Sequence, residues 1–394
     1  MSIEALITDR SRRVDWSGIR AVSALARERP GAVNLSIGQP EFAIPEACKR
    51  AAISAIEHDQ NGYTPNPGLE SLRGALSQRL ARETGWGFDG AGAEAGLMIT
   101  SGTSGGLLLA CMAVLGPGDE VIVPDPYFVM YPHLATMCDA RAVTCSTYET
   151  GFRLTAASVE RLITPRTKMV ILNSPGNPTG VVATSGDCAE LLKLCRRKNI
   201  LLVSDEIYDE FTFSQGRTER TADGPRCPSP ARIAGSVSNV LLIRGFGKTY
   251  GFTGWRLGYA AGPKRLIEEL NKLQQYTFVC APTPLQHGAL AALNVDMSGV
   301  VAMYERRRDL VMSTLGAVAE VVRPDGAYYA FVKVPERLGM SGEAFFRAAA
   351  ERDVLVIPGS TFSGRDTHFR LSFAVRDEAL DRGLGVLAKM LRGQ

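Results

Sequence analysis

The feature that most constrains the fold of this chain is a repeated alternation between short β-branched runs and segments with a helical period. Between the runs lie helical patterns such as residues 186–198, where Cys188, Leu191 and Cys195 recur on one face. The runs themselves are residues 120–123, 142–144, 168–172, 200–203 and 240–243. This alternation predicts an α/β fold, a three-layer sandwich with a mainly parallel central sheet.

The pattern changes after about residue 285, which predicts a second, smaller α+β domain. Long amphipathic helices are expected around residues 286–295 and 299–320, with short strands near 328–332 and 369–373. We expect three parts: an N-terminal segment (1–45) that belongs to the small domain, a large domain (46–285) and a small C-terminal domain (286–394). The Gly-, Ser-, Pro- and Arg-rich stretch 214–239 is expected to be a long surface loop.

Composition argues against several classes of partner. The 44 basic and 41 acidic residues leave a net charge of +3 and form no basic run, so we expect no nucleic acid. The longest apolar stretch, residues 107–115, has roughly half the length that spans a bilayer. It predicts a buried helix rather than a membrane segment, and the N-terminus does not resemble a signal peptide. Eight scattered cysteines without metal-site spacing predict reduced thiols, no metal and a cytoplasmic location.

Chemically informative residues follow four of the predicted strands. They lie in the turns at residues 125–126, 173–180, 205–206 and 245–248. Ligands of parallel sheets collect at the carboxyl ends of the strands. The four loops therefore point to one pocket.

Lys248 follows one of these strands and is flanked by glycines, so it can be buried against a ligand and become nucleophilic. An exposed lysine in a glycine-rich turn would look the same. Residues 247–249, Gly-Lys-Thr, also suggest a phosphate-binding P-loop. That motif needs a glycine six residues before the lysine, where Leu242 stands, so this interpretation fails.

Residues 248–259, Lys-Thr-Tyr-Gly-Phe-Thr-Gly-Trp-Arg-Leu-Gly-Tyr, resemble the cofactor-lysine signature of class I and II aminotransferases, the aspartate aminotransferase superfamily of fold type I. The resemblance extends through separated motifs from about residue 34 to residue 373. It implies that Lys248 carries pyridoxal 5'-phosphate (PLP) as an internal Schiff base. It also implies ping-pong transfer of an amino group from an L-amino acid to a 2-oxo acid, with 2-oxoglutarate as the expected acceptor.

The resemblance also implies which residues hold the cofactor ring. Asp205 corresponds to the aspartate that pairs with the pyridine nitrogen, while Glu206 should point to the other face of its strand. Asn177 and Tyr208 match residues that hydrogen-bond the 3'-oxygen of the cofactor. Phe128 falls where an aromatic ring stacks on the pyridine, with Tyr127 and Tyr131 as alternatives.

For the cofactor phosphate, the resemblance points to residues 101–106, which precede an apolar helical run. Backbone amides at a helix N-terminus favour anions, so Gly102, Thr103 and Ser104 are the candidates. Arg256 matches an arginine that grips the same phosphate.

Four residues carry the implied substrate contacts and subunit arrangement. Arg370 corresponds to the arginine that binds the substrate α-carboxylate, with Gly38 and Asn177 nearby. Tyr63 resembles a tyrosine donated by the neighbouring subunit, which implies a homodimer with shared active sites.

The chain also departs from the family pattern. Gly245 and Gly247 stand where many relatives have serine, and Ser104 stands where some aspartate-using relatives have lysine. A β-lyase, decarboxylase or racemase on the same fold remains an alternative. A cofactor-binding regulatory module is a second one, although the segment before Asn34 is too short for an added DNA-binding domain.

Overall fold

A seven-stranded sheet forms the centre of the larger part of the molecule. The computed structural model describes residues 2–90 and 92–394. The strand order is β2-β10-β9-β6-β5-β3-β4, and all neighbours are parallel except β10, which runs antiparallel to both β2 and β9. The strands are β2 (Ala95–Ser101), β3 (Glu120–Asp125), β4 (Arg141–Ser146), β5 (Thr167–Asn173), β6 (Leu201–Asp205), β9 (Val240–Gly245) and β10 (Leu257–Pro263). The predicted, mainly parallel sheet is therefore confirmed.

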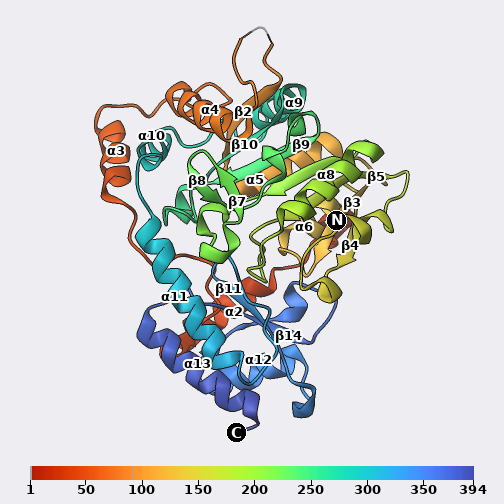
Figure 1. Cartoon of the computed structure of the whole chain (residues 1–394), viewed down its shortest axis with the longest axis vertical. Helices are drawn as coiled ribbons and strands as arrows, with labels where there is room; N and C mark the ends of the chain where they lie inside the picture. The colour runs from red at the N-terminus through yellow and green to blue at the C-terminus, as the bar shows by residue number, and fades with distance from the viewer. Residues whose placement is uncertain (1, 91) are drawn as a thin grey trace.

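Helices cover both faces of this sheet, as the alternation of its side chains requires (Figure 1). In β9, Leu241 and Ile243 join one hydrophobic core, while Val240 and Leu242 join the other. The first face carries α5 (Gly102–Val114), α6 (Met130–Met137) and α9 (Lys264–Gln275). The second carries α3 (Glu46–Glu57), α4 (Glu70–Thr84), α7 (Ala156–Glu160), α8 (Ser185–Lys198) and α10 (Thr283–Ala292). The three-layer sandwich is thus confirmed, and all but the last residue of the apolar stretch 107–115 lies in α5, whose buried residues include Leu107, Leu109 and Ala110.

Helix α8 illustrates how the local sequence sets an element of this sandwich. Thr184 and Asp187 form a reciprocal capping box at its start. The helix ends at Asn199, which adopts a left-handed conformation. Cys188 and Leu191 on its predicted apolar face are buried against the sheet.

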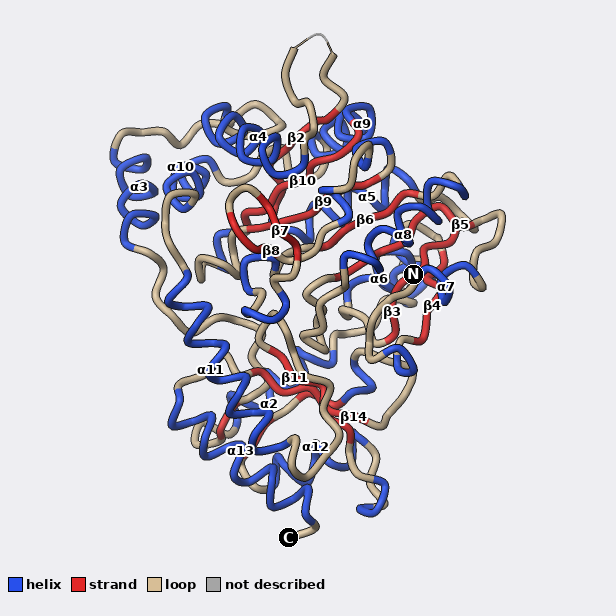
Figure 2. Tube along the Cα trace, viewed as in Figure 1, coloured by secondary structure: helices blue, strands red, loops and turns tan. Residues whose placement is uncertain are grey.

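Below the large sheet in Figure 2 lies a small sheet with its own helices. These elements surround a separate hydrophobic core, the smaller core. Its sheet has the order β11-β14-β13, and β1 pairs in parallel with β12 beside it. The elements are α2 (Gly18–Glu28), β1 (Val33–Asn34), α11 (Ser298–Leu315), β11 (Tyr329–Lys333), α12 (Gly342–Glu351), β12 (Val354–Leu355), β13 (Ile357–Pro358), β14 (His368–Ser372) and α13 (Asp377–Arg392). Helix α11 ends at Leu315 rather than near residue 320, because Gly316 follows it.

The exact division into domains stays a prediction, but packing favours a later boundary than residue 285. Helix α10 packs on α3, and Ala289 and Ala292 belong to the core of the large sheet. Leu293 and Met297 also pack against that core. A boundary near Met297 therefore fits the packing better.

The stretch 214–239 is not a plain surface loop, so that expectation is wrong for much of its length. It contains the hairpin β7 (Glu219–Thr221) and β8 (Gly224–Arg226), and Ala231 and Ser236 are buried. Trp86 Nε1 donates a hydrogen bond to Ser236 Oγ at 2.9 Å. Small residues suit loops, but they also suit close packing against a neighbouring element.

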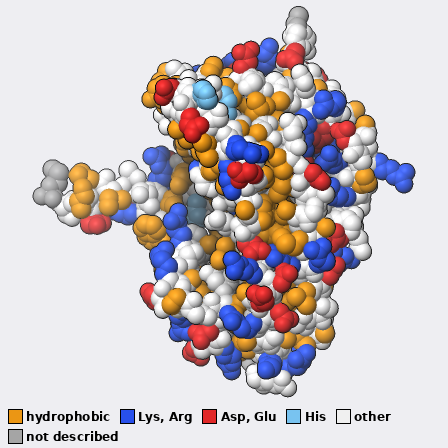
Figure 3. Space-filling view, turned by 90° about the vertical axis from the view of Figure 1, so that its left-hand side faces the viewer, with side chains coloured by type: hydrophobic (Ala, Val, Ile, Leu, Met, Phe, Trp, Pro, Cys, Tyr) orange, Lys and Arg blue, Asp and Glu red, His pale blue; other side chains and the backbone are white. Residues whose placement is uncertain are grey.

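The surface mixes charges of both signs, as the composition predicts. Figure 3 shows Lys and Arg interspersed with Asp and Glu, and the N-terminal segment projecting from the body. In that segment Trp16 is 94% exposed. No helix in the part of the chain that the structure describes is long and apolar enough to cross a membrane.

We expect Leu191→Ala to lower the free energy of unfolding by about 2–5 kcal/mol, because it leaves a cavity between α8 and the sheet. Lys193→Ala on the exposed side of the same helix is the matched control and should change this free energy by less than about 0.5 kcal/mol. Urea denaturation followed by circular dichroism measures both. Equal losses in the two variants would contradict the layer assignment of α8.

Candidate active site

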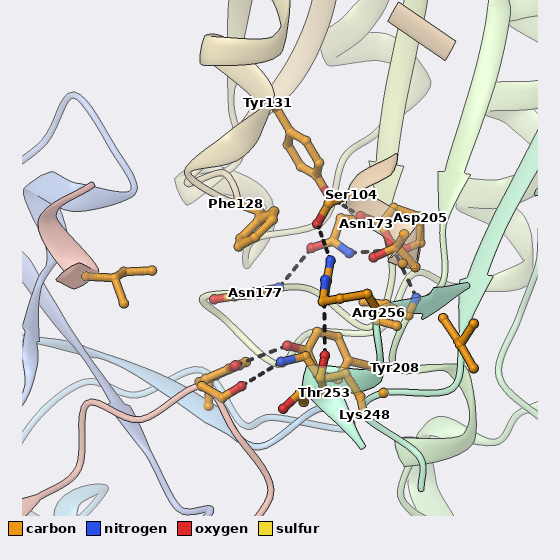
Figure 4. Close-up of a pocket in the computed structure, with 18 of the residues that line it drawn as sticks. Ser104, Phe128, Tyr131, Asn173, Asn177, Asp205, Tyr208, Lys248, Thr253 and Arg256 are labelled. Atoms are coloured by element: carbon orange, nitrogen blue, oxygen red, sulfur yellow. Dashed lines mark hydrogen bonds between the residues drawn. The ribbon is translucent and has the colours of Figure 1, made fainter. Parts of the chain in front are cut away.

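A cavity of about 270 Å³ opens at the carboxyl ends of the strands of the large sheet, where the smaller core meets them. Loops after β3, β5, β6 and β9 and the start of α5 form its walls, and side chains from the smaller core close it. Figure 4 shows these side chains pointing into a common space. Eleven of the twelve residues singled out from the sequence line it: Gly38, Gly102, Thr103, Ser104, Phe128, Asn177, Asp205, Tyr208, Lys248, Arg256 and Arg370.

Lys248 enters the cavity from the loop after β9. Its Nζ donates a hydrogen bond to the carbonyl oxygen of Gly38 at 2.6 Å. Burial lowers the pKa of Lys248, and the positive charges of Arg370 and Arg256 lower it further. A larger share of this lysine is therefore neutral and nucleophilic than of an exposed one.

Asp205 ends β6 and faces the same cavity from the side of α5 and α6. It accepts a hydrogen bond from the Tyr131 hydroxyl at 2.8 Å. Asp205 forms no ion pair within residues 2–90 and 92–394. Burial raises the pKa of its carboxyl to about 6, although the hydrogen bond from Tyr131 acts to lower this pKa. A buried carboxylate without a cation would gain from a cationic ligand group. Glu206 lies on the opposite face, as strand alternation predicts.

The start of α5 and Arg256 together form a cradle suited to an anion. Arg256 Nη2 donates to Ser104 Oγ at 3.3 Å, and Nη1 donates to the Thr253 carbonyl oxygen at 3.2 Å. A Cβ at Gly102, whose φ is +67°, would lie only 2.5 Å from Arg256 Nη2. Glycine is therefore needed both for the backbone conformation and for the close approach of the guanidinium.

Arg370 on β14 is a buried guanidinium that no carboxylate neutralises in the described part of the chain. Its Nη1 donates to Asn177 Oδ1 and its Nη2 to the Ser36 carbonyl oxygen, both at 2.9 Å. Its Nε has no hydrogen-bond partner there. The rings of Tyr329 and Phe362 lie 4.4 and 4.6 Å from its central carbon. A ligand carboxylate would supply the missing charge and acceptor.

Several lining residues were not found from the sequence. The Tyr329 hydroxyl lies 3.0 Å from that of Tyr208. Asn173 Oδ1 accepts from the backbone N–H of Asn177 at 2.9 Å, which holds that loop. Asn173 had a signal, since it opens the predicted turn 173–180, whereas Ile19 on α2 reaches the cavity through tertiary packing.

The aromatic candidates separate clearly in the structure. Phe128 and Tyr131 line the cavity together, with their ring centroids 5.7 Å apart in an edge-to-face arrangement. Tyr127 lines a different cavity. Tyr63 does not line the site of its own chain and is 86% exposed.

The chain is similar to known proteins over nearly its whole length. Residues 30–387 match the family model described as aminotransferase class I and II. A probable N-acetyl-LL-diaminopimelate aminotransferase of Bacillus subtilis is 34% identical over 97% of this chain and 95% of its own length. Aromatic-amino-acid aminotransferase 2 of Thermococcus litoralis is 33% identical over 98% of both chains. The solved aspartate aminotransferase from Thermus thermophilus with maleate superposes with a TM-score of 0.87 at 33% identity, covering 97% of this chain and 99% of that one.

We expect Arg370→Gln to raise the pKa of Lys248, because it removes a positive charge that disfavours the ammonium form. The pKa should stay below the ordinary value, since burial is the larger cause. Competitive labelling of the apoprotein lysines across a pH series, read by mass spectrometry, measures this. The exposed Arg382→Gln is the control and should leave the pKa of Lys248 unchanged.

Proposed function

Because the chain belongs to the class I and II aminotransferase family and is therefore an aminotransferase, we propose that PLP is its cofactor and that Lys248 binds PLP as a Schiff base. The observation that carries this proposal is the convergence in one cavity of a half-buried lysine whose pKa is lowered with two unneutralised charges of opposite sign, Asp205 and Arg370. The named relatives are enzymes, and this chain matches them over nearly their whole length. This favours an aminotransferase over the regulatory module.

The residues present fit the parts of PLP. The cradle of Gly102, Ser104 and Arg256 suits the phosphate, since guanidinium and helix N-terminal groups favour anions. The Asp205 carboxylate suits a protonated pyridine nitrogen, and such a pair would lower the pKa of this carboxyl from its raised value. We assign Thr103 to the phosphate as well, Phe128 to the ring face, and Asn177 and Tyr208 to the 3'-oxygen.

The chemistry follows from these contacts. When bound, PLP supplies an electron sink that stabilises negative charge on the substrate Cα. Arg370 holds the α-carboxylate bidentately, with Asn177 and Gly38 beside it, which orients the substrate. Lys248 Nζ, as a free amine, would take the proton from the substrate Cα as general base.

The substrate pair is the least constrained part of the proposal. The similar proteins are named for aspartate, aromatic and N-acetyl-diaminopimelate substrates, so the family alone does not choose a side chain. We propose an L-amino acid donor and 2-oxoglutarate as the first acceptor to test. Ser104 offers no cation for a second donor carboxylate, which argues against aspartate as the preferred donor.

We further propose a homodimer in which Tyr63 reaches the phosphate cradle of the neighbouring subunit. The side chain of Tyr63 is 86% exposed, and that of Tyr276 is 81% exposed. Large exposed apolar side chains commonly mark a surface that another chain covers. The cytoplasmic location stays a prediction from the cysteine pattern.

Protein purified with PLP should show a visible absorption band that borohydride reduces, and Lys248→Ala should lack it. Mass spectrometry of the reduced protein should find the cofactor on the peptide containing Lys248. Single amino acids without an acceptor should convert the band in a half-reaction, which 2-oxoglutarate reverses. A wild-type protein without the band would overturn the proposed cofactor; pyruvate and ammonia release without an acceptor would indicate a lyase.

The shared site predicts complementation between chains. A mixture of Lys248→Ala and Tyr63→Asp subunits, unfolded and refolded together, should regain about one quarter of wild-type activity, because half of the dimers then contain one intact site. Lys248→Ala mixed with Arg370→Gln is the control. It should regain no activity, because every mixed site keeps one defect. Recovery in neither mixture would refute the contribution of Tyr63 across the interface.

A further inference from the structure

A group of buried charges lies on the face of the sheet opposite the cavity, directly behind Asp205. At its centre is Arg244 of β9, whose side chain is 3% exposed. Its Nε and Nη2 donate to Glu206 Oε2 at 3.0 and 2.9 Å. Its Nη1 donates to Glu83 Oε2 of α4 at 2.9 Å, and Nε lies 3.1 Å from Asp209 Oδ2. One guanidinium therefore contacts three carboxylates.

These contacts join the two loops that carry the proposed chemistry. Glu206 and Asp209 directly follow Asp205 and Tyr208, which face the cavity. Arg244 itself lies on the strand that leads into the loop of Lys248. The backbone N–H of Glu206 also donates to the Ile243 carbonyl oxygen at 2.9 Å, so the two strand ends are in register at this level.

The electrostatics make Arg244 hard to replace at this position. Burial alone would raise the pKa of Glu83, but Arg244 and Arg232 hold it below the ordinary range. Burial raises the pKa of Asp209 to about 6 even though Arg244 opposes the shift. Removing the central cation would leave Glu206 and Asp209 without an ion pair among the described residues, whereas Glu83 would keep Arg232.

Stability alone does not account for this arrangement. A buried ion pair is often no more stabilising than well-packed apolar side chains of similar volume. What an apolar replacement could not do is fix the relative position of two loops through a planar fork with several directed hydrogen bonds.

We propose that Arg244 is a positioning residue that sets the Asp205 loop relative to the Lys248 loop, so that one ligand can engage both side chains. The inference rests on the proposed function, in which Asp205 and Lys248 contact opposite ends of the PLP ring system. It assigns Glu206 as the partner through which Arg244 acts. Glu83 connects Arg244 to α4 and does not connect the Asp205 loop with the Lys248 loop.

Arg244→Lys tests this assignment in the holoenzyme, because lysine keeps the charge but loses the fork. We expect kcat/KM to fall by roughly 100-fold, since small misplacements of reacting groups cost that much. The dissociation constant of PLP should rise about tenfold, by analogy with metal sites, where loss of an outer supporting contact weakens binding by at least that factor. The pH midpoint of the visible band should move to higher pH, because a poorly aligned Asp205 no longer keeps the ring nitrogen protonated.

Glu206→Gln breaks the contact between Glu206 and Arg244 and should shift the same quantities, which keeps the test valid if Arg244→Lys folds poorly.

Glu83→Gln is the matched control from the same buried group. It should lower the thermal unfolding midpoint while leaving the band midpoint and the PLP dissociation constant unchanged. The inference is overturned if Arg244→Lys and Glu206→Gln lower only the unfolding midpoint, or if Glu83→Gln shifts the band equally. A wild-type protein without any visible band would instead refute the cofactor proposal.

Discussion

The hydrogen-bonded register of three parallel strands is the constraint on which the site depends. Asn173 of β5 pairs with Asp205 of β6, and Asp205 pairs with Ile243 of β9, so β5 and β6 end at the same level and β9 continues from there to Gly245. The loops that follow therefore start side by side. A slip of one residue would reverse the side chains of β6 and turn Glu206 into the cavity in place of Asp205. Backbone pairing at the edge of the cavity thus determines which carboxylate faces it.

The cavity holds charges that the protein itself does not balance. Asp205 and Arg370 are buried and Lys248 is half-buried, and in each the pKa is shifted in the direction that disfavours the charged form. The hydrophobic cores supply folding free energy that offsets the cost of removing these charged groups from water. A ligand carrying an anion at one end and a cation at another would relieve it. Because the polar groups already point inward, little reorganisation is needed when such a ligand binds.

The sequence predicted the sandwich well because its strands are buried on both faces and its helices have clear apolar faces. It also predicted that four loops meet at one edge, since that follows from parallel strands. It did not predict that Ser236 is buried, because small polar residues suit both loops and tight packing. Ile19 and Tyr329 could not be found, since only the docking of the smaller core on the larger brings them to the cavity. Lys248 alone was ambiguous, and the other loops made its interpretation specific.

The pairing of β1 with β12 joins two distant parts of the sequence beside the cavity. It brings the segment around Ser36 and Gly38, near the start of the chain, against Arg370 near its end. The acceptor of Lys248 and one of the two acceptors of Arg370 thus come from the segment around Ser36 and Gly38, while the other acceptor of Arg370 is Asn177. A break in the pairing of β1 with β12 would therefore withdraw a hydrogen-bond acceptor from Lys248 and another from Arg370 at the same time.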